Sequence, residues 1–141
     1  MHKIFFSYAV VFINFILLSA CSEDNPTEPG NPNTSVPNPT LSSIQSNVFN
    51  TTCALTGCHG NSGTQANLNL TTGQSFANLV GVTSQFFPPS KRVEAGDATN
   101  SILIMILKGQ VSPRMPKDRA ALSDAIIDSI AKWIDSGALN N

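Results

Sequence analysis

The apolar residues of this 141-residue chain form two blocks, and the segment between the blocks limits folding to the C-terminal part. Residues 4–20 are almost wholly apolar, whereas residues 22–40 hold five of the nine prolines, three acidic residues and one aliphatic residue, Val36. A segment of that composition cannot bury enough apolar surface to offset the entropy lost on ordering. The 101 residues that remain, 41–141, suffice for one small domain.

The N-terminus has the layout of a secretory signal, in which a positively charged tip precedes an apolar run that ends in small residues. The run LSAC at 18–21 resembles the bacterial lipobox, which implies that the cysteine is lipidated and becomes the mature N-terminus. We therefore expect a signal peptide over 1–20 and a disordered linker over 21–40 that starts at a lipidated Cys21. An uncleaved membrane anchor and an unmodified cysteine are the alternatives, since 17 residues is the lower limit for spanning a bilayer.

The first half of the remaining chain has two segments with helical patterns. One starts after Thr40, a good N-cap, and its apolar residues repeat at the spacing of one helix face: Leu41, Ile44, Val48 and Phe49. A second, short helix is expected over 74–80 and ends at Gly81. Residues 57–73 are rich in Gly, Asn and Thr, so we expect a loop between the two helices.

Two further helices are expected in the second half. Residues 101–108 are apolar on all sides, so this helix should be buried, with Thr99 or Asn100 as its cap and Gly109 at its end. The last helix follows Ser123 and has one apolar stripe: Ile126, Ile127, Ile130, Trp133 and Ile134. Four helices without a hairpin signal predict an all-α fold. The long polar loops need something large to pack against, and a bound cofactor would supply it.

The run CALTGCH at 53–59 carries the chemical signal. It is a C-x4-C-H variant of the C-x-x-C-H signature of c-type haem attachment, in which two thiols add to the haem vinyl groups and the imidazole ligates iron. The two additional residues must loop outward for both sulfurs to reach the haem. Gly57 permits such a loop because glycine adopts positive φ without strain.

The second ligand of a six-coordinate iron would have to be a methionine. His59 is the only histidine after the predicted signal, which excludes bis-histidine ligation within this chain and a second haem of the same kind. Met105 lies in the apolar helix, where we expect core packing. Met115 precedes Pro116, and proline favours an extended backbone at the residue before it. We expect Met115 to be the axial ligand; the alternative is a loop methionine packed on the core.

From about Ile44 to Ala138 the chain resembles the class I c-type cytochromes, particularly the C-x4-C-H form common in bacterial periplasmic and surface proteins. The resemblance rests on the helix before the cysteines and on four segments in order: CALTGCHG at 53–60, AGDATNSILIMILKG at 95–109, RMP at 114–116 and LSDAIIDSIAKWIDSGA at 122–138.

This resemblance implies a cytochrome c-like domain over 41–141, with about four helices around one covalent haem c. Thioether bonds would join the haem to Cys53 and Cys58, and His59 and Met115 would be the proximal and distal iron ligands. It also implies that the first and last helices cross beside the haem.

Electron transfer is the expected function, and we do not expect an enzyme. The chain has no G-x-S-x-G or H-E-x-x-H motif, and a His/Met iron has no open position for a substrate. One alternative is a haem-binding sensor or structural module. Another is a domain without haem stabilised by a disulfide, because exported cysteine pairs oxidise. A zinc site is disfavoured because a closed site needs four ligands, and the mature domain has two cysteines and one histidine.

Charge predicts the partners. The domain has seven basic and six acidic residues, so nucleic-acid binding is not expected. The basic rim, which we define as Arg114, Lys117 and Arg119, surrounds Met115 and would steer an acidic redox partner. Its alternatives are solvation alone or pairing with a haem propionate. The last helix instead carries Asp124, Asp128 and Asp135.

We expect a monomer in the cell envelope of a bacterium. The lipid on Cys21 would hold it on a membrane, facing the periplasm or the cell surface. Ser22 stands where an aspartate is often associated with inner-membrane retention, which favours the outer membrane.

Overall fold

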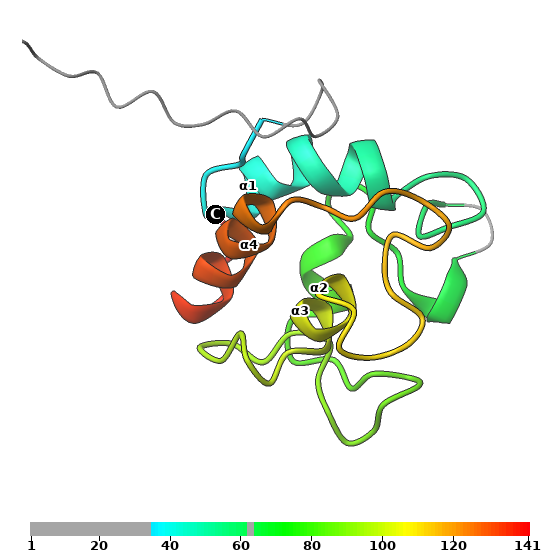
Figure 1. Cartoon of the computed structure of the whole chain (residues 1–141). Helices are drawn as coiled ribbons and strands as arrows, with labels where there is room; N and C mark the ends of the chain where they lie inside the picture. Colours follow the sequence, from blue (N-terminus) through cyan, green and yellow to red (C-terminus); the bar gives the residue numbers. More distant parts are fainter. Residues whose placement is uncertain (1–34, 62–63) are drawn as a thin grey trace, which may run out of the picture.

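The computed structural model describes residues 35–61 and 64–141, and the predicted signal peptide, Cys21 and most of the linker lie outside them. These described ranges contain helices and no strand, which confirms the all-α class (Figure 1). The elements are α1 (Leu41–Ile44), the π-helix η1 (Gln45–Cys53), the 3-10 turn η2 (Gln65–Asn67), α2 (Ser75–Leu79), α3 (Ile102–Leu107) and α4 (Asp124–Asp135). None of the helices described is long and apolar enough to cross a membrane.

The first predicted helix is confirmed, with a change of winding. Thr40 caps it by accepting the Ser43 N–H at 3.3 Å, and the four apolar residues of the predicted face are all buried. From residue 45 the helix widens to π geometry. Side chains of Asn47 and Thr51 donate to carbonyls four residues earlier, both at 2.8 Å, and so compete with backbone N–H groups for those acceptors.

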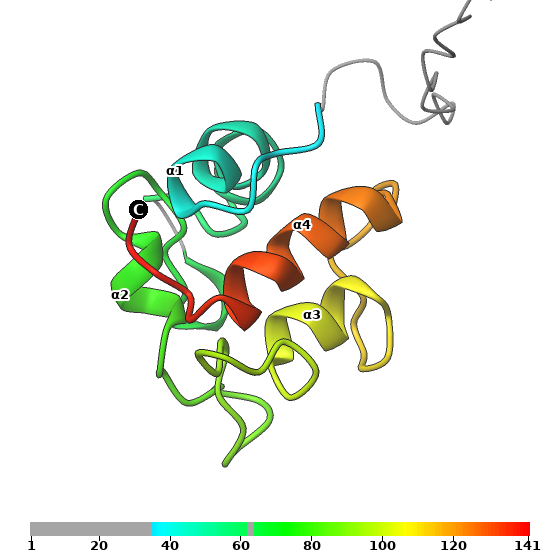
Figure 2. The same cartoon turned by 90° about the vertical axis from the view of Figure 1, so that its left-hand side faces the viewer.

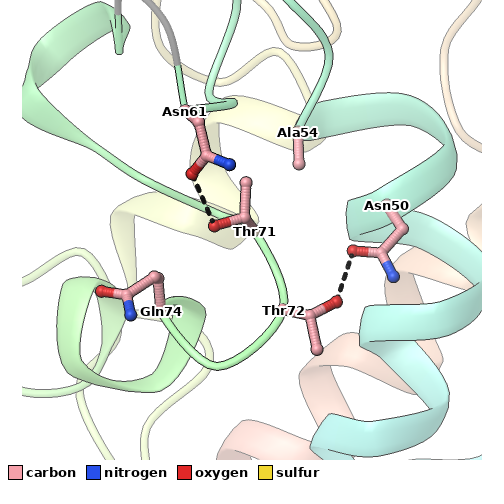
Figure 3. A pocket seen from close by; sticks show the side chains of 6 residues that line it. All are labelled: Asn50, Ala54, Asn61, Thr71, Thr72 and Gln74. Atoms are coloured by element: carbon pink, nitrogen blue, oxygen red, sulfur yellow. Dashed lines mark hydrogen bonds between the residues drawn. The ribbon is translucent and has the colours of Figure 1, made fainter.

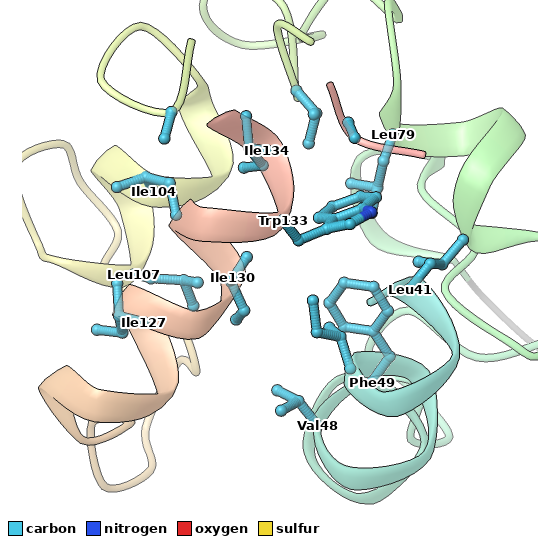
Figure 4. Packing of buried hydrophobic residues seen from close by; sticks show 14 of the residues in the cluster. Leu41, Val48, Phe49, Leu79, Ile104, Leu107, Ile127, Ile130, Trp133 and Ile134 are labelled. Carbon is cyan, nitrogen blue, oxygen red and sulfur yellow. The ribbon is translucent and has the colours of Figure 1, made fainter. Parts of the chain in front are cut away.

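α4 provides the centre of the core. Its predicted stripe is buried, and Trp133 is 1% exposed and donates through Nε1 to the Leu139 carbonyl at 2.8 Å. Figure 2 looks nearly along η1 while α4 runs across the view, so the first and last helices cross as expected. Phe49 and Val48 of η1 face Trp133 and Ile130 across this crossing (Figure 4). Gly137, with φ of 99°, follows the helix end.

α3 differs from its prediction in burial and in its cap. The sequence predicted a helix buried on all sides, but only one face is turned toward the core. The side chains of Leu103, Met105 and Ile106 are half-buried. The N-cap is Ser101 and not Thr99 or Asn100. The Asn100 N–H is instead bound by the Asp97 carboxylate at 3.0 Å, which makes a turn one residue before the helix.

Two segments that the sequence left without structure are attached to the helices. Residues 35–40 of the predicted linker lie against the domain: Pro37 is buried and its carbonyl accepts the Ser129 hydroxyl at 2.5 Å. Residues 80–94 carry two isolated bridges that the sequence did not predict, a parallel one between Val80 and Val93 and an antiparallel one between Thr83 and Lys91.

Candidate functional site

The 53–59 segment folds back on itself directly after η1. Cys53 is half-buried, Cys58 is exposed, and neither forms a disulfide within the described residues. Gly57 has φ of +80°, as predicted, and the His59 N–H donates to the Cys53 carbonyl at 3.1 Å. The four residues between the cysteines therefore form an outward turn that brings the chain back beside its start.

Gly60 is a residue of this segment that the sequence reasoning missed. A β-carbon at this position would lie 2.8 Å from the Ala54 carbonyl oxygen and 3.0 Å from that of Leu55. Real β-carbons do not approach backbone oxygens so closely, so only glycine fits where the turn closes. The glycine directly after His59 was the available signal.

The two thiols have different surroundings. Burial raises the pKa of Cys53 to about 12, and the nearby Cys58 adds to the shift. Cys53 is consequently a protonated thiol at neutral pH, held against the core. Cys58 is exposed on the turn.

His59 is half-buried, and its ring has a defined orientation. Nδ1 lies 3.2 Å from the Gln65 carbonyl oxygen, an acceptor that favours the tautomer with the proton on Nδ1. Burial lowers the pKa of His59 below 6.5, and Arg92 also lowers it, while the carbonyls of Gln65 and Leu68 oppose the shift. The lowered pKa favours the neutral imidazole, and in the tautomer with its proton on Nδ1 the lone pair that a metal would bind is on Nε2.

The Gln65 carbonyl belongs to a tightly held loop. Ala66 and Asn67 have φ of 57° and 53°, and their carbonyls accept hydrogen bonds from the Arg92 guanidinium at 2.8 and 3.3 Å. Arg92 also donates to the Asn78 carbonyl at 2.8 Å. The sequence reasoning did not single out Arg92, because no local spacing relates residue 92 to residue 66.

Met115 is half-buried at the edge of the core, and its N–H donates to the Ile106 carbonyl at 3.0 Å. This bond joins the loop after α3 to the end of that helix. Met105 is also half-buried but does not belong to the core cluster, so its expected core packing is wrong. It lies on the side of α3 that the packing against α4 leaves partly uncovered.

Backbone hydrogen bonds link the two candidate ligands through α3. The side chain of Arg92 binds the 65–67 loop, and its backbone carbonyl accepts the Leu103 N–H at 2.9 Å. Leu103 lies one turn before Ile106, whose carbonyl accepts the N–H of the candidate ligand Met115. Figure 1 places residues 54–70 and 110–121 on the same side of the molecule, while in Figure 2 the former lie beside α2 and the latter beyond α3. Apolar side chains around these segments are half-buried: Cys53, Leu68, Phe76, Leu103, Ile106 and Met115.

The basic rim is exposed. Arg114 donates to the Arg119 carbonyl at 2.8 Å, which folds the rim onto itself, and Lys117 lies between them in the sequence. On α4, Asp124 and Asp128 are exposed, as predicted.

Of two surface hollows, the larger reaches the 53–59 segment at Ala54. The larger, of about 510 Å³, is bordered by neutral side chains from η1 and the 61–74 segment (Figure 3): Asn50, Ala54, Asn61, Thr71, Thr72 and Gln74. The smaller, of about 220 Å³, lies between α1 and α2. Within the described ranges, no three His, Cys, Asp or Glu side chains gather as a metal-binding group.

The segment thus offers two thiols and an imidazole, and the loop after α3 offers the thioether of Met115. These groups suit a prosthetic group with two covalent attachment points and one soft and one borderline metal ligand. No family model, no curated protein and no solved structure matches this chain.

Proposed function

We propose that this chain is a membrane-tethered monohaem c-type cytochrome with a cytochrome c-like fold, and that its function is electron transfer. The observation that carries the proposal is the state of His59 in the C-x4-C-H run. Its Nδ1 faces a backbone carbonyl at 3.2 Å, which favours the tautomer with a lone pair on Nε2 for iron, and Cys53 and Cys58 are free thiols.

The residues present fit a covalent haem. Cys53 and Cys58 supply the two thiols for thioether bonds, and the positive φ of Gly57 forms the turn that the C-x4-C spacing requires. His59 would bind the iron on one side. A bound haem supplies a reversible one-electron couple; the chain contributes its ligands, orients them and limits the access of water.

Met115 is the proposed distal ligand because of its position and surroundings. Its backbone is fixed to the end of α3, so the side chain is presented from a short loop and not from the helix. The half-buried faces of Leu103 and Ile106 lie on the same helix, and a haem would cover them. Covering apolar surface stabilises a complex by about 25 cal/mol per Å².

Localisation follows from the N-terminus. We propose that Cys21 carries the lipid and that residues 22–34 form the spacer, with the domain attached from residue 35 by the Pro37–Ser129 contact. The protein would face the periplasm or the cell surface of a bacterium. A Cys21→Ala variant should leave the membrane fraction or keep its signal peptide; a membrane-bound and normally processed variant would refute lipidation.

The basic rim supports an acidic redox partner. Its three side chains are exposed beside the proposed ligand, where they raise association rates at low salt. Electron transfer to an anionic acceptor should slow as ionic strength rises, and Lys117→Glu should weaken that dependence. Asp124→Asn, a charge change on α4, is the matched control. A wild-type electron-transfer rate that does not depend on ionic strength would refute steering by the basic rim.

The experiment for electron transfer is a visible spectrum with a redox titration of the full chain, produced in a host with haem c assembly machinery. We expect a low-spin haem with a weak sulfur-to-iron band in the ferric form and a reversible one-electron reduction. A five-coordinate iron would indicate ligand sensing or peroxide chemistry instead. A pyridine haemochrome spectrum without haem c would overturn the proposal.

A further inference from the structure

We propose that Arg92 is a positioning residue for His59, and that it acts through the 65–67 loop, whose carbonyl orients the imidazole. The inference deepens the proposed function and rests on the role of His59 as iron ligand. Arg92 is 33 residues from His59 in the sequence, and its guanidinium binds the carbonyls directly after the one that His59 uses.

The loop needs an external support. Ala66 and Asn67 are consecutive residues with a β-carbon at positive φ, a region that such residues rarely adopt. A strained turn of this kind persists only where contacts from elsewhere hold it. The Gln65 N–H donates to the Cys58 carbonyl at 2.9 Å and holds the start of the turn, while the carbonyls of Ala66 and Asn67 are held by Arg92.

Arg92 has the geometry to provide that support. Its guanidinium donates to the carbonyls of Ala66 and Asn67 in the loop and to that of Asn78 in α2, at 2.8, 3.3 and 2.8 Å. The planar, multidentate guanidinium fixes acceptors that lie in different directions. Its own backbone is fixed as well, because the Arg92 N–H donates to the Val82 carbonyl at 2.7 Å and its carbonyl accepts the Leu103 N–H.

The consequence lies at Nδ1 of His59. With the loop held, the Nδ1 proton has a fixed acceptor, so the ring keeps one tautomer and one orientation. Without the guanidinium, Ala66 and Asn67 relax toward negative φ and the Gln65 carbonyl moves with them. The Nδ1 proton then exchanges with water, and the imidazole ring turns more freely about its Cβ–Cγ bond.

The test is the solvent-exchange rate of the His59 Nδ1 proton, measured by NMR on the haem-loaded full chain. Arg92→Gln should raise the rate about twofold to tenfold, as loss of one hydrogen bond would. The exchange rate of Arg92→Lys should lie between those of the wild type and Arg92→Gln, because an ammonium can hold one of the carbonyls but not all three. Lys91→Gln is the matched control: it removes the neighbouring charge, whose ammonium binds Thr83 at 3.1 Å and not the loop.

An unchanged rate in both Arg92 variants, or an equal rise in Lys91→Gln, would overturn the inference, and so would a loss of thermal stability without faster exchange. If Arg92→Gln does not fold, Arg92→Lys decides the question. A chain without haem would refute the proposed function but not this inference. In that case nitrogen chemical shifts of the haem-free chain report the tautomer, which should shift from Nδ1–H toward Nε2–H in the Arg92 variants.

Discussion

The molecule has a helical half and a loop half, and the two are stabilised differently. We define the helical half as α1, η1, α4 and the buried face of α3, and the loop half as residues 54–61, 64–70 and 109–121. In the helical half Trp133, Phe49 and Ile130 are at most 1% exposed. In the loop half Leu70 joins the core, but Leu68 and Met115 are only half-buried.

The supports of the loop half are individual hydrogen bonds, such as His59 to Gln65 and Met115 to Ile106. Apolar side chains left half-covered on fixed backbones suit a partner that fills the space beside them. The comparison teaches that the polypeptide alone completes the helical half, whereas a covalent haem is proposed to complete the loop half.

Removing the centre of the helical half should have the largest effect. Trp133→Ala should lower the free energy of unfolding by about 3–5 kcal/mol, because it leaves a large cavity and the Leu139 carbonyl without its donor. Denaturant titration of the haem-loaded chain measures it. Leu139→Ala, at a side chain that is 58% exposed, should change stability by about 0.5 kcal/mol at most. Equal losses in both variants would contradict the central place of Trp133.

Disrupting the turn at Gly60 in the loop half should have the second-largest effect on stability. Gly60→Ala forces a β-carbon to 2.8 Å from the Ala54 oxygen and should cost about 1–3 kcal/mol through displaced backbone. The same variant should lower the fraction of chains that carry haem. Thr56→Ala, exposed on the same turn, is the control and should change neither quantity. Normal haem content and stability in Gly60→Ala would show that the turn has no part in attachment.

The methionines separate ligation from packing. Met115→Ala should abolish the sulfur-to-iron band and lower the reduction potential, because methionine ligation raises it. Met105→Leu nearly conserves volume and should cost less than about 1.5 kcal/mol without a spectral change. Visible spectra and potentiometry of both variants show which methionine ligates the iron. The assignment is wrong if Met105→Leu is the variant that loses the band.

The smallest effect should be the pH dependence of the haem-free chain, made as a Cys53→Ser, Cys58→Ser variant. The pKa of His59 is lowered in the folded state, so the unfolded state binds its proton first. Stability should be full above pH 6.5 and decline as the pH falls below that value, and His59→Gln should flatten this dependence. The pKa of Asp97 is lowered below 3.8 by its bonds to Asn100, so that group does not titrate here. A rise in stability on acidification would contradict the burial of a neutral imidazole.

Local periodicity predicted most of the helical half. Apolar spacing located the first helix and α4, and glycines marked the ends of α2, α3 and α4, because these features depend on residues within two turns of one another. The burial of α3 was overestimated, since composition does not say which face meets a neighbour. The π-winding of η1 was missed because it depends on side chains such as Asn47 that bind the helix carbonyls.

The sequence named candidate site residues but not the contacts that hold them in place. Residue types and order singled out the cysteines, His59 and Met115, and the positive φ of Gly57 is confirmed. The Gln65 carbonyl, Arg92 and the close approach at Gly60 were not foreseen. Each depends on contacts between backbone segments that are brought together only by folding.

The central claim is that a haem is bound covalently to this chain, and the intact mass tests it most directly. The full chain should be produced in a host with haem c assembly machinery and weighed beside a Cys53→Ser, Cys58→Ser variant. We predict that the wild-type mass exceeds that of the double variant by one haem, after allowance for the two substitutions, and that fragmentation places the addition on residues 53–59. The double variant should lack this addition. A wild-type mass without haem, under conditions in which a control cytochrome is fully loaded, would contradict the account.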